Sequence, residues 1–180
     1  MQMTIHTFKR SIFLAMLAGG IVAGTAAVAL VAGAGGTDTR VDVRSETAAS
    51  VNNSLVFVDV PGANVVVTVP TGQSRLFIAR FAGESQCFGA AAAPAGFCSL
   101  QIIATNVAGA SVPFDPSSGV DYAFDSNPAG AADDQWEGNA MERSKRLGAG
   151  TYRIRVQRRV TNNTTFFRLD DWHFSVETRL

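Results

Sequence analysis

The chain has 180 residues, with 15 Lys and Arg against 15 Asp and Glu, and its formal net charge at pH 7 is zero. This length suits a single domain with a real hydrophobic core, and two domains would be crowded. The charge balance gives no bulk attraction to polyanions, so nucleic acid is not expected as a partner.

The N-terminal residues 1–36 have the pattern of an export leader. Lys9 and Arg10 precede an uncharged run that ends in small residues at Gly36. We predict that residues 1–34 are a signal peptide cut after Ala34, which places the protein outside the cell or on the outer face of the envelope. Cleavage would remove Lys9 and Arg10 and leave 13 basic and 15 acidic residues, a net charge of −2.

An uncleaved membrane anchor is the alternative for this leader. The apolar run at 11–31 has 21 residues, close to the ~20 that span a bilayer as a helix. In that case the protein would contact a membrane through residues 11–31 alone.

Residues 35–53 are polar and mixed in charge, which favours a tether or a loosely attached first strand. From Ser54 onward, short β-branched or aromatic runs alternate with turn-forming residues. The sequence therefore predicts one all-β domain over 54–180, an antiparallel, jelly-roll-like β-sandwich of about eight strands with few and short helices. Strands are expected at 54–60, 64–69, 74–82, 97–104, 120–124, 141–147, 151–160 and over a last segment that includes 172–177.

Three of these segments carry specific expectations. The segment 74–82 is apolar on both faces at its middle, which is typical of a central strand. In 97–104 the two-residue period places Cys98, Leu100 and Ile102 on one face. The alternation in the last segment places Trp172 in the core.

The segments 141–147 and 151–160 flank Gly148-Ala149-Gly150 and are predicted to form a hairpin. In the second segment Tyr152, Ile154 and Val156 should face the core, with polar residues on the other side. Facing strands would merge the basic residues of the hairpin into one patch, made of Arg143, Lys145, Arg146, Arg153, Arg155, Arg158 and Arg159.

Such a patch would bind anionic wall polymers, glycans or an acidic partner. Its candidate ligand-binding residues are Arg143, Lys145, Arg153 and Arg155. The alternative is a charged face that keeps a sheet edge from pairing with other chains.

Cys87 and Cys98 are the only cysteines, and an exported protein meets an oxidising compartment. A disulfide between them is predicted. A two-thiol metal site is the alternative, but it would need further soft ligands, and His173 is the only histidine after the leader.

A second candidate metal site lies in the acidic stretch between residues 115 and 137. Carboxylates in flexible loops suit calcium, which takes six to eight oxygen ligands. The candidate calcium ligands are Asp121, Asp125, Asp133 and Asp134, although ordinary polar loops have the same composition. No other cofactor is expected.

Catalysis is not expected. Asp171, His173 and Ser175 are the residue types of a nucleophilic triad, but alternate residues on one strand face lie about 6.8 Å apart, whereas a proton relay needs contacts of about 3 Å. A glycosidase that uses carboxylates such as Asp133, Asp134 or Asp171 is the remaining enzymatic alternative.

Trp136 lies in a polar segment between Asp134 and Glu137, where its ring could stack on a sugar. A carbohydrate-binding module is therefore an alternative to a more general role in binding or in the structure of the cell exterior. In either case the expected partner is an extracellular glycan or protein.

The C-terminal part of the chain carries a family resemblance. Residues 143–147, the strand start at 150–154 and the stretch 167–172 resemble a pattern in secreted bacterial β-sandwich proteins, which are similar to compact jelly rolls of the C1q/TNF type. The resemblance implies the fold and a homotrimer, and it implies no catalytic residues.

Overall fold

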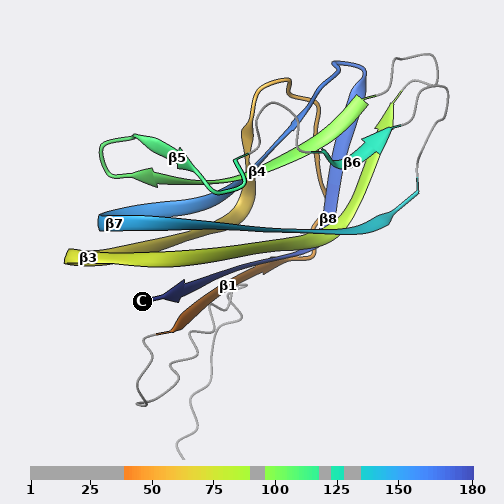
Figure 1. The fold of residues 1–180 in the computed structure, drawn as a ribbon. Coiled ribbons are helices and arrows are strands. Elements are labelled where there is room, and N and C mark those ends of the chain that lie inside the picture. Colours follow the sequence, from red (N-terminus) through yellow and green to blue (C-terminus); the bar gives the residue numbers. More distant parts are fainter. Residues whose placement is uncertain (1–38, 90–95, 118–122, 128–134) are drawn as a thin grey trace, which may run out of the picture.

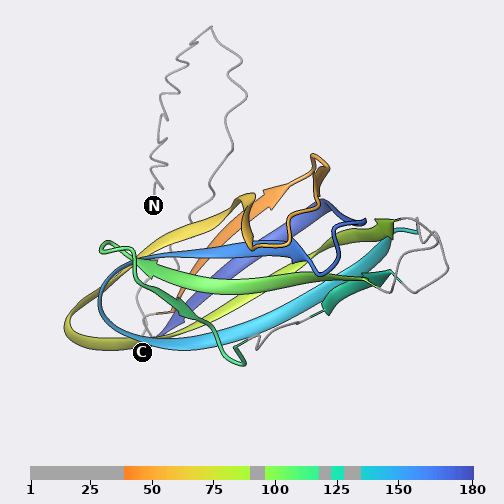
Figure 2. The same ribbon diagram turned by 90° about the horizontal axis from the view of Figure 1, so that it is seen from above.

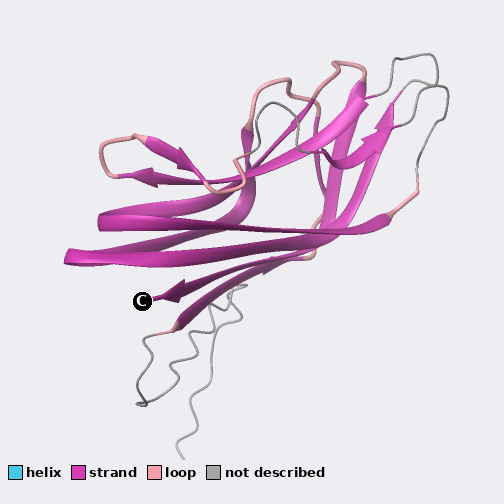
Figure 3. Cartoon of the chain, in the orientation of Figure 1, coloured by secondary structure: helices cyan, strands magenta, loops and turns pink. Residues whose placement is uncertain are grey.

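A computed structural model describes residues 39–89, 96–117, 123–127 and 135–180. These residues form strands and loops, without a helix among them (Figure 3). In this part of the chain no helix is therefore long and apolar enough to cross a membrane, and the predicted leader at 1–34 lies outside it. The strands are β1 (Arg40–Glu46), β2 (Ser50–Asn52), β3 (Val58–Gly89), β4 (Gly96–Asn106), β5 (Ser111–Pro113), β6 (Ala123–Asn127), β7 (Glu137–Val160) and β8 (Thr165–Arg179).

The strands pair in the order β1-β8-β3-β7-β4-β5, while β2 pairs with β8 and β6 pairs with β4. All of these pairings are antiparallel. The predicted all-β fold of about eight strands is confirmed. The predicted strand at 120–124 lies partly outside the described residues, and its described end belongs to β6.

The two longest strands, β3 and β7, run side by side and bend together, so that one continuous sheet folds over itself (Figures 1 and 2). Asn64–Val69 pairs with Gly150–Arg155, and Ser74–Ser85 pairs with Glu137–Gly148. The register shifts between Val69 and Ser74, at the bend. Gly72 and Gly150 supply the positive φ values of 78° and 148° that L residues avoid.

The bend divides the sandwich into two layers. Sheet A contains β1, β2, β8, the part of β3 after the bend and the part of β7 before it. Sheet B contains the other halves of β3 and β7 together with β4, β5 and β6. The segment 74–82 lies between β8 and β7, so its predicted central place is confirmed.

The predicted hairpin around Gly148-Ala149-Gly150 is wrong. The segments on its two sides belong to one strand, β7, and both pair with β3. A glycine-rich interruption between two β runs is compatible with a turn or with a bend in a continuous strand, and β3 supplies a long enough partner for the bend. The Pro61-Gly62 interruption likewise lies inside β3, where the register shifts between Asp59 and Asn64.

The tether predicted at 35–53 is also wrong for the residues that form β1 and β2. Both strands pair with β8 and extend sheet A, as the alternative of a first strand predicted. The sequence of β1 is polar because this strand lies at the edge of the sheet, where it meets solvent, and it therefore lacks the apolar alternation that predicts a strand.

The core between the sheets contains the predicted apolar faces. Trp172 is 2% exposed, and Phe81 of sheet A lies 5.8 Å from Phe124 of sheet B in an edge-to-face ring contact. Cys87 of β3 and Cys98 of β4 form the predicted disulfide, which ties the two sheets together. The alternating residues Leu100, Ile102, Ile154 and Val156 are buried, and Tyr152 packs against the core. Phe174 and Val176 of β8 are buried as well.

A bulge in β8 changes which of its residues face the core. Phe167 and Leu169 are buried before the bulge, and Trp172 is buried after it. Asp171 has a φ of 41°, and the register against β3 shifts between Ala82 and Glu84. The bulge thus brings the acidic pair Asp170-Asp171 to the outer side of sheet A.

The disulfide should contribute to stability by restricting the unfolded chain. We expect the double variant Cys87→Ala/Cys98→Ala to lose roughly 3 kcal/mol of unfolding free energy, because the closed loop is short. Urea denaturation of the variant and of the oxidised wild-type protein measures the difference. Equal midpoints and slopes in both proteins would contradict a stabilising role.

Gly83 should tolerate no side chain, because a Cβ atom built there lies 2.8 Å from Trp172 Cβ. We expect Gly83→Ala to cost about 1–3 kcal/mol of stability through overpacking. Gly148→Ala is the matched control, since a Cβ at Gly148 meets no atom within 4 Å. Thermal unfolding of both variants checks this, and an equal loss in the two would show that Trp172 does not pack on Gly83.

Candidate functional site

The outer surface of sheet A, here called face A, contains a groove of about 370 Å³. Ala82 of β3 lies opposite His173 of β8 on one side and opposite Ala140 of β7 on the other. The two alanines are small and exposed, which leaves a hollow across three strands between larger side chains. The groove is lined by Arg80, Phe81, Ala82, Ala140, Met141, Glu142, His173 and Ser175.

Ion pairs form one end of the groove. Arg80 donates to Glu142 at 2.6 Å and to Glu177 at 3.2 Å, and Arg179 donates to Glu177 at 2.6 Å. The hydrogen bond from Arg179, followed by that from Arg80, lowers the pKa of the Glu177 carboxyl. The bonds to Glu142 and Glu177 raise the pKa of Arg80. These four side chains form one connected network of ion pairs and hold one another in place.

An aromatic cluster lies at the opposite end of face A. The Arg168 guanidinium is 5.6 Å from the ring centre of Trp136 and 5.8 Å from that of Phe88. Phe88 stacks on Phe166 with ring centres 5.5 Å apart, and Arg168 donates to Gln86 at 3.3 Å. Trp136 stays 42% exposed, so Arg168 supports its ring without covering it.

Two carboxylates lie between the aromatic cluster and the groove. Glu84 of β3 is directly opposite Asp170 of β8, and Asp171 follows in the bulge. Directly opposed like charges destabilise a sheet. In the described part of the chain no cation pairs with these carboxylates, so they are open to a ligand with hydrogen-bond donors.

Of the predicted ligand-binding residues, Trp136 is exposed on face A, and the basic residues are divided between different surfaces. Arg143 is buried and donates to the Glu142 carbonyl, while Lys145 pairs with Asp115 at 2.9 Å. Arg153 and Arg155 lie on the outer surface of sheet B, which we call face B. A single basic patch of all seven residues is therefore wrong, because β7 crosses from one sheet to the other.

Arg158 is another of those seven, and it is 4% exposed. It donates to the carbonyl and hydroxyl oxygens of Ser50 at 2.9 and 3.0 Å. Burial lowers its pKa to about 10. Arg158 thus fixes β2 to the sandwich.

The candidate calcium ligands are only partly described. Asp121, Asp133 and Asp134 lie outside the described residues, and Asp125 accepts a hydrogen bond from Ser85 Oγ at 2.8 Å. Within the described ranges no group of three or more His, Cys, Asp or Glu residues is arranged to hold a metal. Calcium binding stays a prediction.

His173 has a hydrogen-bonding neighbour on another strand. Its Nδ1 lies 3.4 Å from Ser45 Oγ of β1, while Asp171 and Ser175 are two residues away along β8. This contact does not form the proton relay of a nucleophilic triad, because among the described residues no carboxylate is hydrogen-bonded to the imidazole.

Sequence reasoning missed most of face A. Its unpredicted members are Ala82, Glu84, Gln86, Phe88, Ala140, Phe166 and Arg168. Phe88 and Phe166 lie on the outer side of their strands. Aromatic residues at outward positions of a strand could have indicated a binding surface in the sequence. The pairing of β3 with β8, which joins residues about 80 positions apart, was not readable from one sequence.

No protein-family model matches this sequence, and a search of the curated proteins found no match. A search of solved structures found similarity to the CBM22-1 xylan-binding domain of Paenibacillus barcinonensis Xyn10C, with 11% sequence identity. The similarity covers 76% of this chain and 80% of that domain, with a TM-score of 0.31. It is too distant to bear on the function of this chain.

The two tryptophans should differ in their access to solvent. Because Trp136 is 42% exposed and Trp172 is 2% exposed, we expect acrylamide to quench part of the wild-type fluorescence strongly. In Trp136→Phe the remaining emission comes from Trp172 and should resist quenching. Strong quenching in that variant would contradict the buried position of Trp172.

Proposed function

We propose that this protein is a non-catalytic carbohydrate-binding domain of the cell exterior and that face A binds the sugar. The observation that carries the proposal is the exposed Trp136 ring, supported by Arg168 at one end of a line that leads past carboxylates to the groove. Secretion after cleavage of residues 1–34 belongs to the same proposal.

The chemistry of face A suits sugars. A sugar ring has an apolar face of C–H groups and an edge of hydroxyl groups. An exposed indole ring packs on the apolar face, and carboxylates such as Glu84 and Asp170 accept hydrogen bonds from the hydroxyls. A few polar groups beside an apolar surface are the usual composition of a small-molecule site.

The shape of face A suits a polymer. Alternate residues of β3 from Phe88 to Arg80 bring the aromatic cluster, the carboxylates, the groove and the ion pairs into one row. The eight residue steps from Arg80 to Phe88 span about 26 Å of strand. A row of this length on an open sheet fits an extended polysaccharide better than a single enclosed sugar.

The opposed pair Glu84 and Asp170 also supports a second candidate function, that of a glycosidase. Directly opposite side chains have Cβ atoms about 4.5–5.5 Å apart, and a retaining glycosidase needs carboxyl groups about 5–5.5 Å apart. We favour binding because both residues lie on an open face. A glycosidase would release reducing ends from a polysaccharide, and the Glu84→Gln variant would release none.

Trp136→Ala should weaken polysaccharide binding at least about tenfold, because removing an aromatic side chain that acts as a binding hot spot costs about 2 kcal/mol or more. Affinity electrophoresis against cellulose derivatives, xylan, mannan and β-glucan measures the change. Val107→Ala is the matched control, since Val107 is 87% exposed in the turn between β4 and β5. No retardation by any of these polymers, or equal retardation of Trp136→Ala and wild type, would overturn the proposal.

A further inference from the structure

Face B has a different chemistry from face A and shares none of its residues. Along β7 the outward positions hold Arg153, Arg155, Gln157 and Arg159. Alternate residues of a strand are about 6.8 Å apart, so the guanidinium groups form a row down the middle of the sheet. The Asp59 carboxylate contacts Arg153 and Arg155 in this row.

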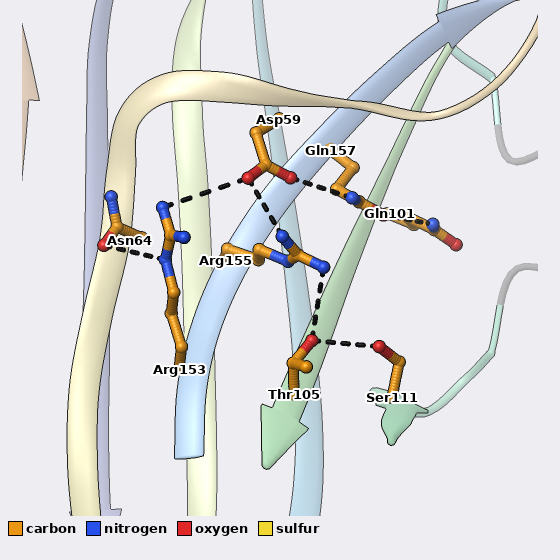
Figure 4. Close-up of polar contacts among 8 residues, drawn as sticks. All are labelled: Asp59, Asn64, Gln101, Thr105, Ser111, Arg153, Arg155 and Gln157. Atoms are coloured by element: carbon orange, nitrogen blue, oxygen red, sulfur yellow. Dashed lines mark hydrogen bonds and ion pairs between the residues drawn. The ribbon is translucent and has the colours of Figure 1, made fainter. Parts of the chain in front are cut away.

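Asp59 shows what the row recognises. One of its carboxylate oxygens accepts a hydrogen bond from Arg155 at 3.0 Å and lies 3.9 Å from Arg153, while the other accepts from Gln157 at 2.8 Å (Figure 4). Asp59 lies in β3 directly before the register shift that separates it from Asn64. Two guanidinium groups and an amide thus already converge on one carboxylate.

The residues around this carboxylate are held by a chain of hydrogen bonds across four strands. Gln101 of β4 donates to Gln157 at 2.8 Å, and Arg155 donates to Thr105 at 3.3 Å. Thr105 in turn contacts Ser111 of β5 at 2.9 Å (Figure 4). A ligand would therefore meet side chains that are already ordered, which lowers the entropy cost of binding.

The row has more donors than its own contacts use. Each guanidinium has five N–H donors, so Arg153 and Arg155 have ten together. They make three hydrogen bonds, to Asn64, Asp59 and Thr105. Arg155 Nε is buried without a partner, and the Arg153 side chain is 48% exposed. Arg153 and Arg155 bring two positive charges to the one negative charge of Asp59, so this part of the row keeps a positive charge.

From these observations we propose that face B is a second binding site and that it takes an acidic polysaccharide whose sugar rings carry carboxylates. Guanidinium groups bind carboxylates through paired hydrogen bonds, and the ordered amides and hydroxyls match sugar hydroxyls. We choose a polysaccharide over an acidic peptide because the groups held around Asp59 are amides and hydroxyls, which match sugar hydroxyls, and an acidic peptide is an outcome of the test. The proposal does not rest on sugar binding at face A.

The test uses the full mature chain and polygalacturonate as the probe, with the methyl-esterified polymer as its uncharged counterpart. We expect the protein to bind polygalacturonate, to lose affinity as salt rises, and to bind the ester at least about tenfold more weakly. Absence of binding to polygalacturonate would overturn the proposal. So would equal affinity for poly-glutamate, which would show that the row accepts acidic peptides.

Variants locate the site. Arg153→Gln should weaken polygalacturonate binding about tenfold, while Arg146→Gln, a matched exposed arginine on the other half of β7, should have no effect. Asp59→Asn should strengthen binding severalfold, because it removes the internal competing charge and keeps an oxygen acceptor. A purely structural network would give no such gain.

Trp136→Ala separates this site from face A. We expect it to leave polygalacturonate binding unchanged. Loss of that binding in Trp136→Ala, or equal effects of Arg153→Gln and Arg146→Gln, would contradict a separate site on face B. Circular dichroism of each variant confirms that it is folded, which is expected for Arg153→Gln and Arg146→Gln because both arginines are exposed.

Discussion

The fold depends on the pairing of β3 with β7 through a shared bend. The two strands stay paired on both sides of Val69 and Gly150. In sheet B this ribbon supplies the edge strand, β3, and its neighbour β7, and in sheet A it supplies the central β3 and the edge β7. The core fills the space between these layers, and the Cys87–Cys98 disulfide closes it on the side of β4. The same strand, β7, therefore presents outward side chains on two opposite surfaces.

This division explains why the two surfaces differ in chemistry. Before the bend, the outward residues of β7 include the small Ala140, which leaves room for the groove across β7, β3 and β8. After the bend, outward residues are Arg153 and Arg155, which gather around Asp59. The bulge at Asp171 also shapes face A, since it turns Trp172 inward and leaves the carboxylates on the face that holds Trp136. Each proposed site thus follows from a local irregularity in an otherwise regular sheet.

The sequence predicted what depends on local alternation. The buried places of Leu100, Ile154 and Trp172, and the exposure of Trp136, follow from a period of two residues and from polar neighbours. It did not predict what depends on long-range pairing. Whether Gly148-Ala149-Gly150 is a turn or a bend is decided by β3, and the neighbourhood of Glu84 with Asp170 is decided by register. Single-sequence patterns contain neither kind of information.

The central claim is that the folded ribbon carries two separate ligand surfaces. Amide and indole NMR shifts during titration with a neutral oligosaccharide and then with an oligogalacturonate test it most directly. We expect the neutral sugar to move the Trp136 indole and the amides near Ala82 and Ala140, and the acidic sugar to move those near Arg153 and Arg155. Shifts at the same residues for both ligands would contradict the claim.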